Sequence, residues 1–526
     1  MIEDSNWRFS TIPALCERAA SIYGDAIAIE DGVSLTFHDV DALRRRAAKA
    51  LIAAGVLKGD RVMIWAPNSY RWFIAALGLV TIGAVLIPAS TRYKSAEIEE
   101  LAARSGASFL FSAGDFLGQY YPDQLTDAAR RRVRLVVVIE HARTGDTDWD
   151  AFLASGDAIT DEAVAKRQRA VGPDDLCDML FTSGTTGFPK GVMYGHRQAL
   201  QAISDWADRV GIRRGDRLLV IPPFFHAFGY RSGAIVSLMR GATLIPQRTY
   251  DADDVLRRIA RDRISVIPGP PTIFQGMLQH PEMKSFDRSS LRLGITGGAV
   301  IPAVLVRRMR EELGFEGVVN GYGLTECGGY GAMCSAADDD ETIANTAGKP
   351  FPGVELGVMD ADGRLLEKNK PGEIVLRGYF VMKGYFNDEE ATRKTIDPEG
   401  WLHTGDIGYV DDKGNLHIED RLKEMYISGG FNCYPAEIER LMSAHPAVGQ
   451  IAVIGVPDER LGEVGKAFVV LRPGAAATEQ ELIAWARETI ANFKAPRSIE
   501  FRGALPTSAQ GKVLKNKLRE ETLAAG

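Results

Sequence analysis

The sequence predicts an α/β protein with a large N-terminal domain and a small α+β C-terminal domain. Up to about residue 420, helix-period stretches such as 39–54 alternate with short apolar runs such as 134–139 and 218–221. This alternation is typical of helices packed on a largely parallel sheet. We therefore assign residues 1–422 to the N-terminal domain and residues 423–526 to the C-terminal domain.

The C-terminal domain has a different pattern from the rest of the chain. It begins with a helix over 435–443, continues with a strand pair within 451–470, and then forms a helix that opens at Thr478, with Glu481 completing a capping box. No Pro/Gly-rich linker precedes residue 423, so we expect a tight hinge between the two domains rather than a loose tether.

Composition excludes several classes of protein. Of the 526 residues, 45% are apolar and 25% are charged, which are the proportions of a globular protein rather than a disordered or fibrous one. The formal net charge is −7, and no long basic block is present. We therefore expect neither nucleic acid nor an anionic membrane as the partner, and any phosphate chemistry has to be local.

The cysteines and the apolar segments indicate a cytoplasmic protein without a transmembrane segment. The five cysteines form neither a CxxC pair nor a cluster with histidines, so we expect no disulfide framework and no zinc site. The first ten residues are acidic and polar, unlike a secretion signal. Residues 72–89 carry no charge, but their glycines and Pro88 favour a buried helix followed by a short strand.

The segment 181–191 is the first candidate binding site. It follows the apolar run 176–180 and combines glycines with hydroxyl side chains, whose N–H and O–H groups can surround phosphate oxygens. It does not match the Walker A pattern, and a mobile surface loop is the alternative interpretation. The candidate phosphate ligands are Thr182, Ser183, Gly184, Thr185, Thr186, Gly187 and Lys190.

Two further clusters follow apolar runs. After Val319, the segment that contains Gly321, Tyr322, Gly323, Thr325 and Glu326 offers a ring for a purine, a hydroxyl for a phosphate and a carboxylate for Mg²⁺. A strand-end turn with a solvated Glu is the alternative. After the run 291–295, three small residues allow a flat base to approach the backbone: Gly297, Gly298 and Ala299.

One more cluster supplies groups for a ribose. The carboxylate of Asp406 can accept hydrogen bonds from both ribose hydroxyls, and Arg421 can contact the sugar or a phosphate. By itself, Asp406 is more typical of a turn. Together, the clusters provide groups for phosphates, base, metal and sugar, and we expect an ATP site.

These motifs, in this order, resemble the acyl- and aryl-CoA synthetases of the adenylate-forming superfamily. The resemblance continues through 420–423, 428–432, 434–437 and 506–512. It implies a small β subdomain at the end of the N-terminal domain and a mobile C-terminal lid. It also implies the substrates ATP and coenzyme A, the metal Mg²⁺ and two half-reactions. A carboxylic acid and ATP first give an acyl-adenylate and pyrophosphate, and the CoA thiol then displaces AMP.

The resemblance also implies roles for particular residues. Lys512 would bridge the carboxylate and the α-phosphate, Glu326 would hold Mg²⁺, and Thr182 would belong to the catalytic phosphate segment. Lys423 would be the hinge about which the lid rotates between the half-reactions. That rotation would bring Ser428, Gly429 and Gly430 to the pantetheine arm; a plain hairpin turn is the alternative interpretation of these glycines.

The acyl pocket follows from the same resemblance. His226 would separate the acyl and CoA sites. Arg231 departs from the family pattern, and the sequence leaves open whether it serves a polar group of the substrate or faces solvent. The small-molecule acid would be medium-chain, long-chain or ring-bearing, and steroid-ring propionates are included. The expected lining residues are Phe225, His226, Phe228, Gly229, Tyr230, Pro271, Gly321, Gly323 and Cys327.

Two other functions remain open from the sequence. An adenylation enzyme that loads a separate carrier protein would share the first half-reaction, and a silent nucleotide-binding regulator would share only the binding site. Glu326, Lys190 and Lys512 argue against the regulator, because a binder needs no adenylation lysine. The sequence leaves a homodimer open.

Overall fold

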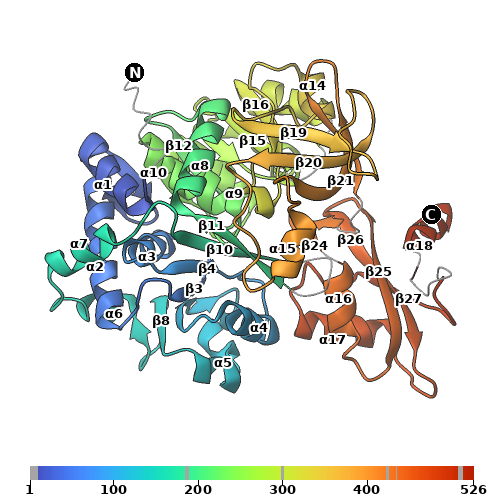
Figure 1. The fold of residues 1–526 in the computed structure, drawn as a ribbon, viewed down its shortest axis with the longest axis horizontal. Coiled ribbons are helices and arrows are strands. Elements are labelled where there is room, and N and C mark those ends of the chain that lie inside the picture. The colour runs from blue at the N-terminus through green and yellow to red at the C-terminus, as the bar shows by residue number, and fades with distance from the viewer. Residues whose placement is uncertain are drawn as a thin grey trace. The chain divides into compact units, whose positions relative to one another are not determined.

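The computed structural model describes residues 10–183, 189–297, 301, 303–421, 426–433, 435–506, 513 and 515–525. The chain forms two compact units. Unit 1 holds the described residues up to Thr91, Ala102–Phe181 and Gly191–Glu419, and unit 2 holds those of Arg92–Leu101, Thr182–Lys190 and Asp420–Gly526. The α/β class with a large N-terminal and a small C-terminal part is confirmed (Figure 1). The domain boundary at residue 422 stays a prediction.

Two sheets with helices around them form most of unit 1. Within the described residues, a seven-stranded sheet has the order β11 (Pro189–Gly195), β10 (Leu176–Ser183), β4 (Val85–Pro88), β3 (Arg61–Trp65), β5 (Phe109–Ala113), β8 (Leu135–Glu140) and β9 (Thr147–Asp148). A nine-stranded sheet has the order β18 (Lys349–Pro350), β17 (Ala332–Met333), β16 (Gly317–Tyr322), β15 (Leu293–Gly297), β14 (Val266–Pro268), β12 (Arg217–Val220), β13 (Thr243–Pro246), β1 (Ile27–Glu30) and β2 (Ser34–Thr36).

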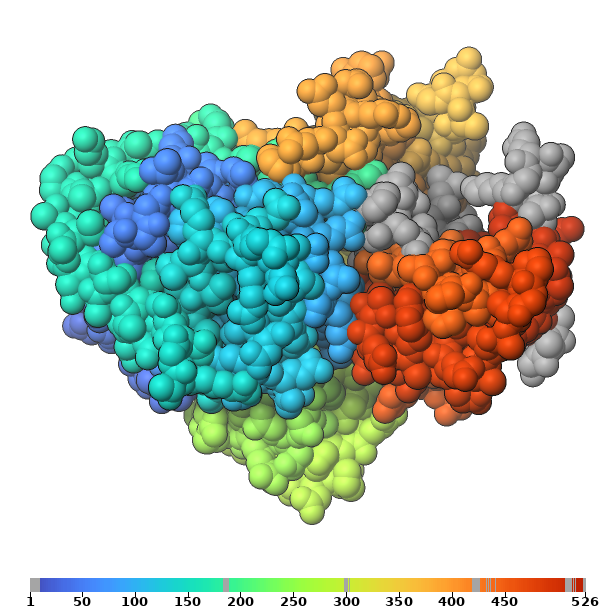
Figure 2. Space-filling model, turned by 90° about the horizontal axis from the view of Figure 1, so that it is seen from below, coloured from blue at the N-terminus to red at the C-terminus, as the bar shows by residue number. Residues whose placement is uncertain are grey.

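The central strands of both sheets are parallel. In the nine-stranded sheet β16, β15, β14, β12, β13 and β1 pair in parallel, and in the seven-stranded sheet β10, β4, β3, β5, β8 and β9 do so. Buried parallel strands are apolar on both faces, which explains why they appear in the sequence as short apolar runs. In Figure 2 the blue to teal part of the chain and the yellow-green part occupy different regions of the face shown.

Helices cover these sheets. The uncharged segment after residue 71 is confirmed as a buried helix and a short strand, α3 and β4, and Ser69 caps α3 by accepting from the Trp72 N–H. Among the described residues, the α-helices that precede β18 are α1 (Ile12–Tyr23), α2 (Phe37–Ala53), α3 (Tyr70–Thr81), α4 (Ser95–Ser105), α5 (Asp127–Arg132), α6 (Trp149–Ala154), α7 (Asp161–Arg169), α8 (His196–Val210), α9 (Ala227–Gly229), α10 (Val236–Arg240), α11 (Ala252–Asp262), α12 (Pro271–Gln279), α13 (Ala303–Arg308) and α14 (Asp340–Asn345). Most of α4 belongs to unit 2.

A small antiparallel sheet completes unit 1, as the resemblance implied. Its order is β19 (Val354–Met359), β20 (Gly372–Gly378), β21 (Leu402–Val410) and β22 (Leu416–Arg421), with α15 (Glu389–Thr395) between β20 and β21. Met359, Val375 and Trp401 form its buried cluster.

Unit 2 contains the predicted helix–strand pair–helix succession. The strand pair is β25 (Val448–Asp458) and β26 (Gly462–Leu471), and Thr478 and Glu481 form the expected capping box. Its other elements are β23 (Tyr426–Ser428), β24 (Phe431–Cys433), α16 (Pro435–Met442), α17 (Glu479–Thr489), β27 (Ser498–Phe501) and α18 (Lys515–Ala525). Among the described residues, no helix combines the length and apolarity needed to cross a membrane.

Candidate active site

The predicted binding segments of unit 1 lie at one edge of the nine-stranded sheet. The segments 221–230, 269–271, 296–297 and 321–326 lie at or just after the carboxyl ends of β12, β14, β15 and β16. Because these strands are parallel, their carboxyl ends share one edge. Open α/β sheets bind ligands at that edge, so the fold brings together segments that are far apart in the sequence.

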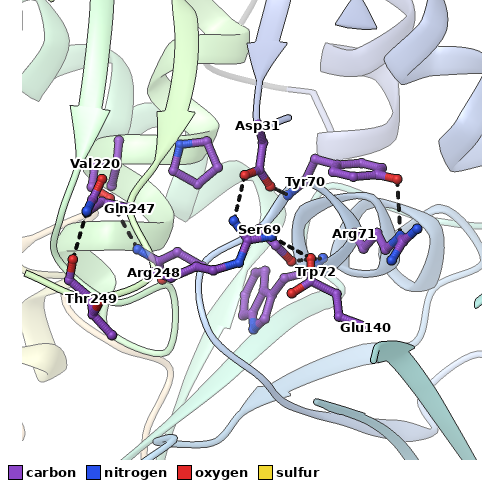
Figure 3. Close-up of polar contacts among 12 residues, drawn as sticks. Asp31, Ser69, Tyr70, Arg71, Trp72, Glu140, Val220, Gln247, Arg248 and Thr249 are labelled. Carbon is purple, nitrogen blue, oxygen red and sulfur yellow. Dashed lines mark hydrogen bonds and ion pairs between the residues drawn. The ribbon is translucent and has the colours of Figure 1, made fainter. Parts of the chain in front are cut away.

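A polar network joins the carboxyl ends of the two sheets. Arg248, directly after β13, forms ion pairs with Asp31, after β1, at 2.8 Å and with Glu140, at the end of β8, at 2.7 Å (Figure 3). Asp31 also accepts from the backbone N–H of Tyr70 at 2.9 Å. Both carboxylates are nearly buried, so the pairing compensates for the cost of removing them from water.

Asn68 makes a second link between the sheets. Its Nδ2 donates to the carbonyls of Val220 and Pro222 at 3.2 and 3.0 Å, and its Oδ1 accepts from the Phe224 N–H at 2.7 Å. The side chain is buried, so it positions the start of the expected acyl segment. Sequence reasoning missed both Asn68 and Arg248; the only available signal was a polar side chain just after an apolar run.

The expected phosphate segment is described only at its ends. Thr182 is half-buried near the end of β10, and Lys190 is half-buried near the start of β11, while Ser183 is the last residue of β10. Four of its predicted residues lie outside the described residues: Gly184, Thr185, Thr186 and Gly187. Outside them also lie Gly298, Ala299, Lys423 and Lys512.

Tyr322 and Asp406, two residues of the expected ATP site, contact each other. The Tyr322 hydroxyl donates to Asp406 Oδ2 at 2.6 Å, and both side chains are buried. Burial first, and the negative charge of Asp406 second, raise the pKa of Tyr322 well above its usual value, so the phenol stays a donor. Gly321 ends β16 with Tyr322, and the neighbouring Gly297 ends β15.

Glu326 is held in place from another part of unit 1. Its Oε1 accepts from the Tyr385 hydroxyl at 2.7 Å, and its carbonyl accepts from the Met382 N–H at 2.8 Å. Thr325 and Glu326 begin a short 3₁₀ turn, and both are half-buried. No sequence pattern indicated the role of Tyr385.

This arrangement fits a Mg²⁺ that arrives with ATP. Among the residues that the structure describes, no group of three His, Cys, Asp or Glu side chains could hold a metal. Mg²⁺ is typically bound by one or two carboxylates together with substrate phosphates and water, so the half-buried carboxylate of Glu326 is an adequate protein ligand.

His226 is exposed next to buried neighbours. Its Nδ1 accepts from the Phe228 N–H at 3.3 Å, which places the proton of the neutral ring on Nε2. Although the side chain is exposed, desolvation by the surrounding protein, followed by the positive charge of Arg231, lowers the pKa of His226 to about 4.

The other expected acyl-pocket residues differ in exposure. Phe225 and Phe228 are half-buried, whereas the Tyr230 ring is fully buried and packs 5.5 Å from Trp72, centroid to centroid. The buried residues further include Gly229, Pro271 and Cys327. Burial raises the pKa of the Cys327 thiol to about 12, so this side chain is no nucleophile near neutral pH.

Arg231 does not face solvent, and that expectation is wrong. Its side chain is 1% exposed and pairs with Asp178 of β10, which is also 1% exposed. A buried guanidinium requires such a partner, because leaving its charge unpaired away from water is costly.

In unit 2, the expected pantetheine residues form a hairpin turn. Ser428 pairs with Phe431, and the two residues between them, Gly429 and Gly430, have φ of 57° and 82°. A two-residue turn with positive φ at both positions favours glycine by itself. Arg421 ends β22.

Comparison with known protein families gives two matches along the chain. Residues 16–386 match the model described as AMP-binding enzyme, and residues 437–512 match the model described as AMP-binding enzyme C-terminal domain. The first match alone covers more than half of the chain. The chain belongs to the AMP-binding enzyme family.

Curated relatives of this AMP-binding enzyme are CoA ligases. It is 49% identical over 512 residues to the 3-(7a-methyl-1,5-dioxo-octahydro-1H-inden-4-yl)propanoyl:CoA ligase of Mycobacterium tuberculosis, with 97% of this chain and 98% of that protein covered. It is 44% identical over 519 residues to the ligase of the same name from Rhodococcus jostii, with 97% and 99% covered. The predicted class, an AMP-forming acid–thiol ligase that uses ATP, Mg²⁺ and CoA, is confirmed.

A solved structure is similar over nearly the whole chain. The amide bond synthetase McbA from Marinactinospora thermotolerans is 27% identical, with a TM-score of 0.84, and 96% of this chain and 99% of that chain are covered. The fold of this AMP-binding enzyme therefore also occurs in a protein that is named for making an amide bond rather than a CoA thioester.

Proposed function

We propose that the enzyme converts a propanoic acid carried on a fused, methylated bicyclic dione into its CoA thioester. The observation that carries this proposal is that two relatives, at 49% and 44% identity and covered nearly end to end, share that substrate in their names. Phe225 and Phe228 of the expected acyl segment are half-buried, so their rings are partly accessible to a ring-bearing acid.

In the first half-reaction, the carboxylate would attack the α-phosphorus of ATP and release pyrophosphate. Both reactants are anionic, so the site has to supply positive charge and donors; Lys190 and Lys512 would supply charge, and Thr182 a hydroxyl. Asp406, oriented by Tyr322, would accept from the ribose. Mg²⁺, when bound, screens the phosphate charge. The remaining donors would be Ser183, Gly184, Thr185, Thr186 and Gly187.

In the second half-reaction, the CoA sulfur would attack the acyl carbon and AMP would leave. A thiol with a pKa of about 8.5 already supplies some thiolate near neutral pH, so no strong base is needed. His226 would stand between the acyl and CoA sites, Lys423 would be the hinge, and Ser428, Gly429 and Gly430 would face the pantetheine arm.

A pyrophosphate-release assay over a panel of acids tests the substrate. The panel contains the bicyclic dione propanoate, the same ring system without ketones, and short, medium, long and aromatic acids. We expect kcat/KM for the bicyclic dione to exceed that for every straight-chain acid by about tenfold, since about 1.4 kcal/mol of extra transition-state binding suffices. A medium- or long-chain acid as the best substrate would contradict the proposal.

The acceptor is tested with the acyl-adenylate made in that assay. CoA, a phosphopantetheinyl carrier protein and a primary amine are offered separately, because the fold also occurs in an amide bond synthetase. We expect AMP release to be fastest with CoA. A faster reaction with the carrier or the amine would reassign the second half-reaction, and no pyrophosphate with any acid would indicate a silent nucleotide-binding protein.

Two further expectations stay predictions. A homodimer would give twice the chain mass of 57.4 kDa in sedimentation equilibrium. Fractionation of the producing cells would test the cytoplasmic location.

A further inference from the structure

Arg231 is a charged side chain enclosed by the core of unit 1. It lies in the helical segment Tyr230–Ile235, directly after the expected acyl segment, and is 1% exposed. Besides its ion pair with Asp178, its guanidinium carbon lies 4.0 Å from the centroid of the Tyr194 ring. Asp178 and Tyr194 belong to β10 and β11, the strands that lead into and out of the phosphate segment.

The same guanidinium reaches the loop that carries Glu326. Its Nη1 donates to the Gly328 carbonyl at 3.5 Å, and the Tyr194 hydroxyl donates to the carbonyls of Glu326, at 3.5 Å, and Phe380. The packing is close, because a Cβ built on Gly328 would lie 3.0 Å from the Tyr194 hydroxyl and 3.2 Å from Arg231 Nη1. One cation thus connects β10, β11 and the Glu326 loop.

Stability alone is a weak reason for this pair. Burying two charges costs about as much as their attraction returns, and apolar residues of similar size often replace such a pair without loss of stability. A buried, hydrogen-bonded ion pair instead defines a geometry. Each charge is stable away from water only where it contacts its partner. Ser232, the next residue, adds a hydrogen bond to the Tyr330 hydroxyl at 3.0 Å.

We propose that Arg231 is a positioning residue of the adenylation half-reaction, which fixes the Glu326 loop relative to the two strands that flank the phosphate segment. At 1% exposure it does not reach the substrate, so it acts through Gly328, Tyr194 and Asp178. The inference rests on the proposed function, because Glu326 is the expected ligand of the Mg²⁺ that screens the phosphates in the first half-reaction.

The test removes the pair without leaving a buried charge behind. In Arg231→Met combined with Asp178→Asn, we expect adenylation kcat to fall at least about tenfold and the Mg²⁺ concentration for half-maximal rate to rise about tenfold. CoA transfer from preformed acyl-adenylate should stay within about threefold. Arg231→Lys should recover part of the loss, because it keeps the charge beside Asp178 but lacks the planar fork that also reaches Gly328.

A matched pair elsewhere in unit 1 is the control. Arg292 and Asp216 form an ion pair with side chains 15% and 3% exposed, and both precede strands of the nine-stranded sheet, at the amino edge opposite the site. Arg292→Met with Asp216→Asn should lower the melting temperature to a similar extent yet keep adenylation and its Mg²⁺ dependence within twofold.

Calorimetric titration of ATP at several Mg²⁺ concentrations, without any acid, separates this inference from the substrate proposal. If the parent enzyme binds ATP in a Mg²⁺-dependent manner but activates none of the acids, the substrate proposal fails, and the Arg231 variants should still weaken the Mg²⁺ dependence of binding. The inference would be overturned if the double variant folds and both its adenylation kcat and its Mg²⁺ concentration for half-maximal rate stay within twofold of the parent values. If the double variant does not fold, the Arg231→Lys variant decides instead. Values within twofold of the parent for Arg231→Lys would then overturn the inference.

Discussion

His226 is expected to act as a neutral imidazole. Its pKa of about 4 lies below the value of 6.5 for an ordinary histidine, so protonation between these values favours the unfolded chain. The contribution to stability is therefore complete above about pH 6.5 and is lost as the pH falls toward 4. Near neutral pH the ring carries no charge, and we expect no activity change near pH 6.5 that depends on this residue.

Long-range ¹H–¹⁵N correlation spectra of the histidine rings measure this directly. We expect the His226 signals to report the neutral form with the proton on Nε2 down to about pH 5. His226→Gln identifies the signal, which is necessary because burial also lowers the pKa of His196 to about 4. A midpoint near 6.5 for the assigned signal would contradict the expectation.

Gly323 is expected to tolerate no side chain. A Cβ there would lie 2.2 Å from the carbonyl carbon and oxygen of Gly329 and 2.7 Å from the Tyr330 nitrogen, so backbone atoms would have to move. Gly323→Ala should lower the free energy of unfolding by about 1–3 kcal/mol and weaken ATP binding. Gly503→Ala is the control, because its Cβ would meet nothing within 4 Å. Equal urea midpoints for the two variants would show that the contact is not restrictive.

At the scale of elements, Asn68 is expected to hold the acyl segment against β3. Asn68→Ala leaves the Pro222 carbonyl and the Phe224 N–H without this partner, at a cost of about 1–3 kcal/mol for each group left unsatisfied. The Val220 carbonyl still accepts from the Gln247 N–H at 3.0 Å. We expect KM for the acid to rise more than KM for ATP. The exposed Asn345 provides a control substitution, Asn345→Ala, which should change neither constant. Parallel increases in both constants after Asn68→Ala would contradict the local role.

The sequence predicted individual strands and helices better than it predicted which of them lie next to each other. The largely apolar runs 176–180 and 291–295 correspond to the strands β10 and β15, because a parallel strand buried on both faces is mostly apolar. Asp178 is the exception in β10, and its charge is paired with Arg231. The pairing of β1 with β13 was not predictable, since it joins segments more than 200 residues apart. The same holds for the ion pairs of Arg248, whose partners follow strands of different sheets.

At the scale of the whole molecule, motifs predicted candidate site residues where a residue's chemistry is visible in its local pattern. Tyr322 and Asp406 were expected in one site, and they share a hydrogen bond. Tyr385, Asn68 and Asp178 carry no such pattern, because each acts by contacting a residue distant in the sequence. Arg231 stood out only as a charge within an apolar segment, and its role depends on contacts that no local pattern contains.

The two half-reactions are expected to use different parts of the chain, and Lys512→Ala distinguishes them. The variant and the parent are each assayed by rapid quench for acyl-adenylate formation from acid and ATP, and for CoA transfer from preformed acyl-adenylate. We expect adenylation to fall at least about a hundredfold, because the cation between two anionic reactants is lost, while CoA transfer stays within about threefold. Equal losses in both half-reactions would contradict the claim.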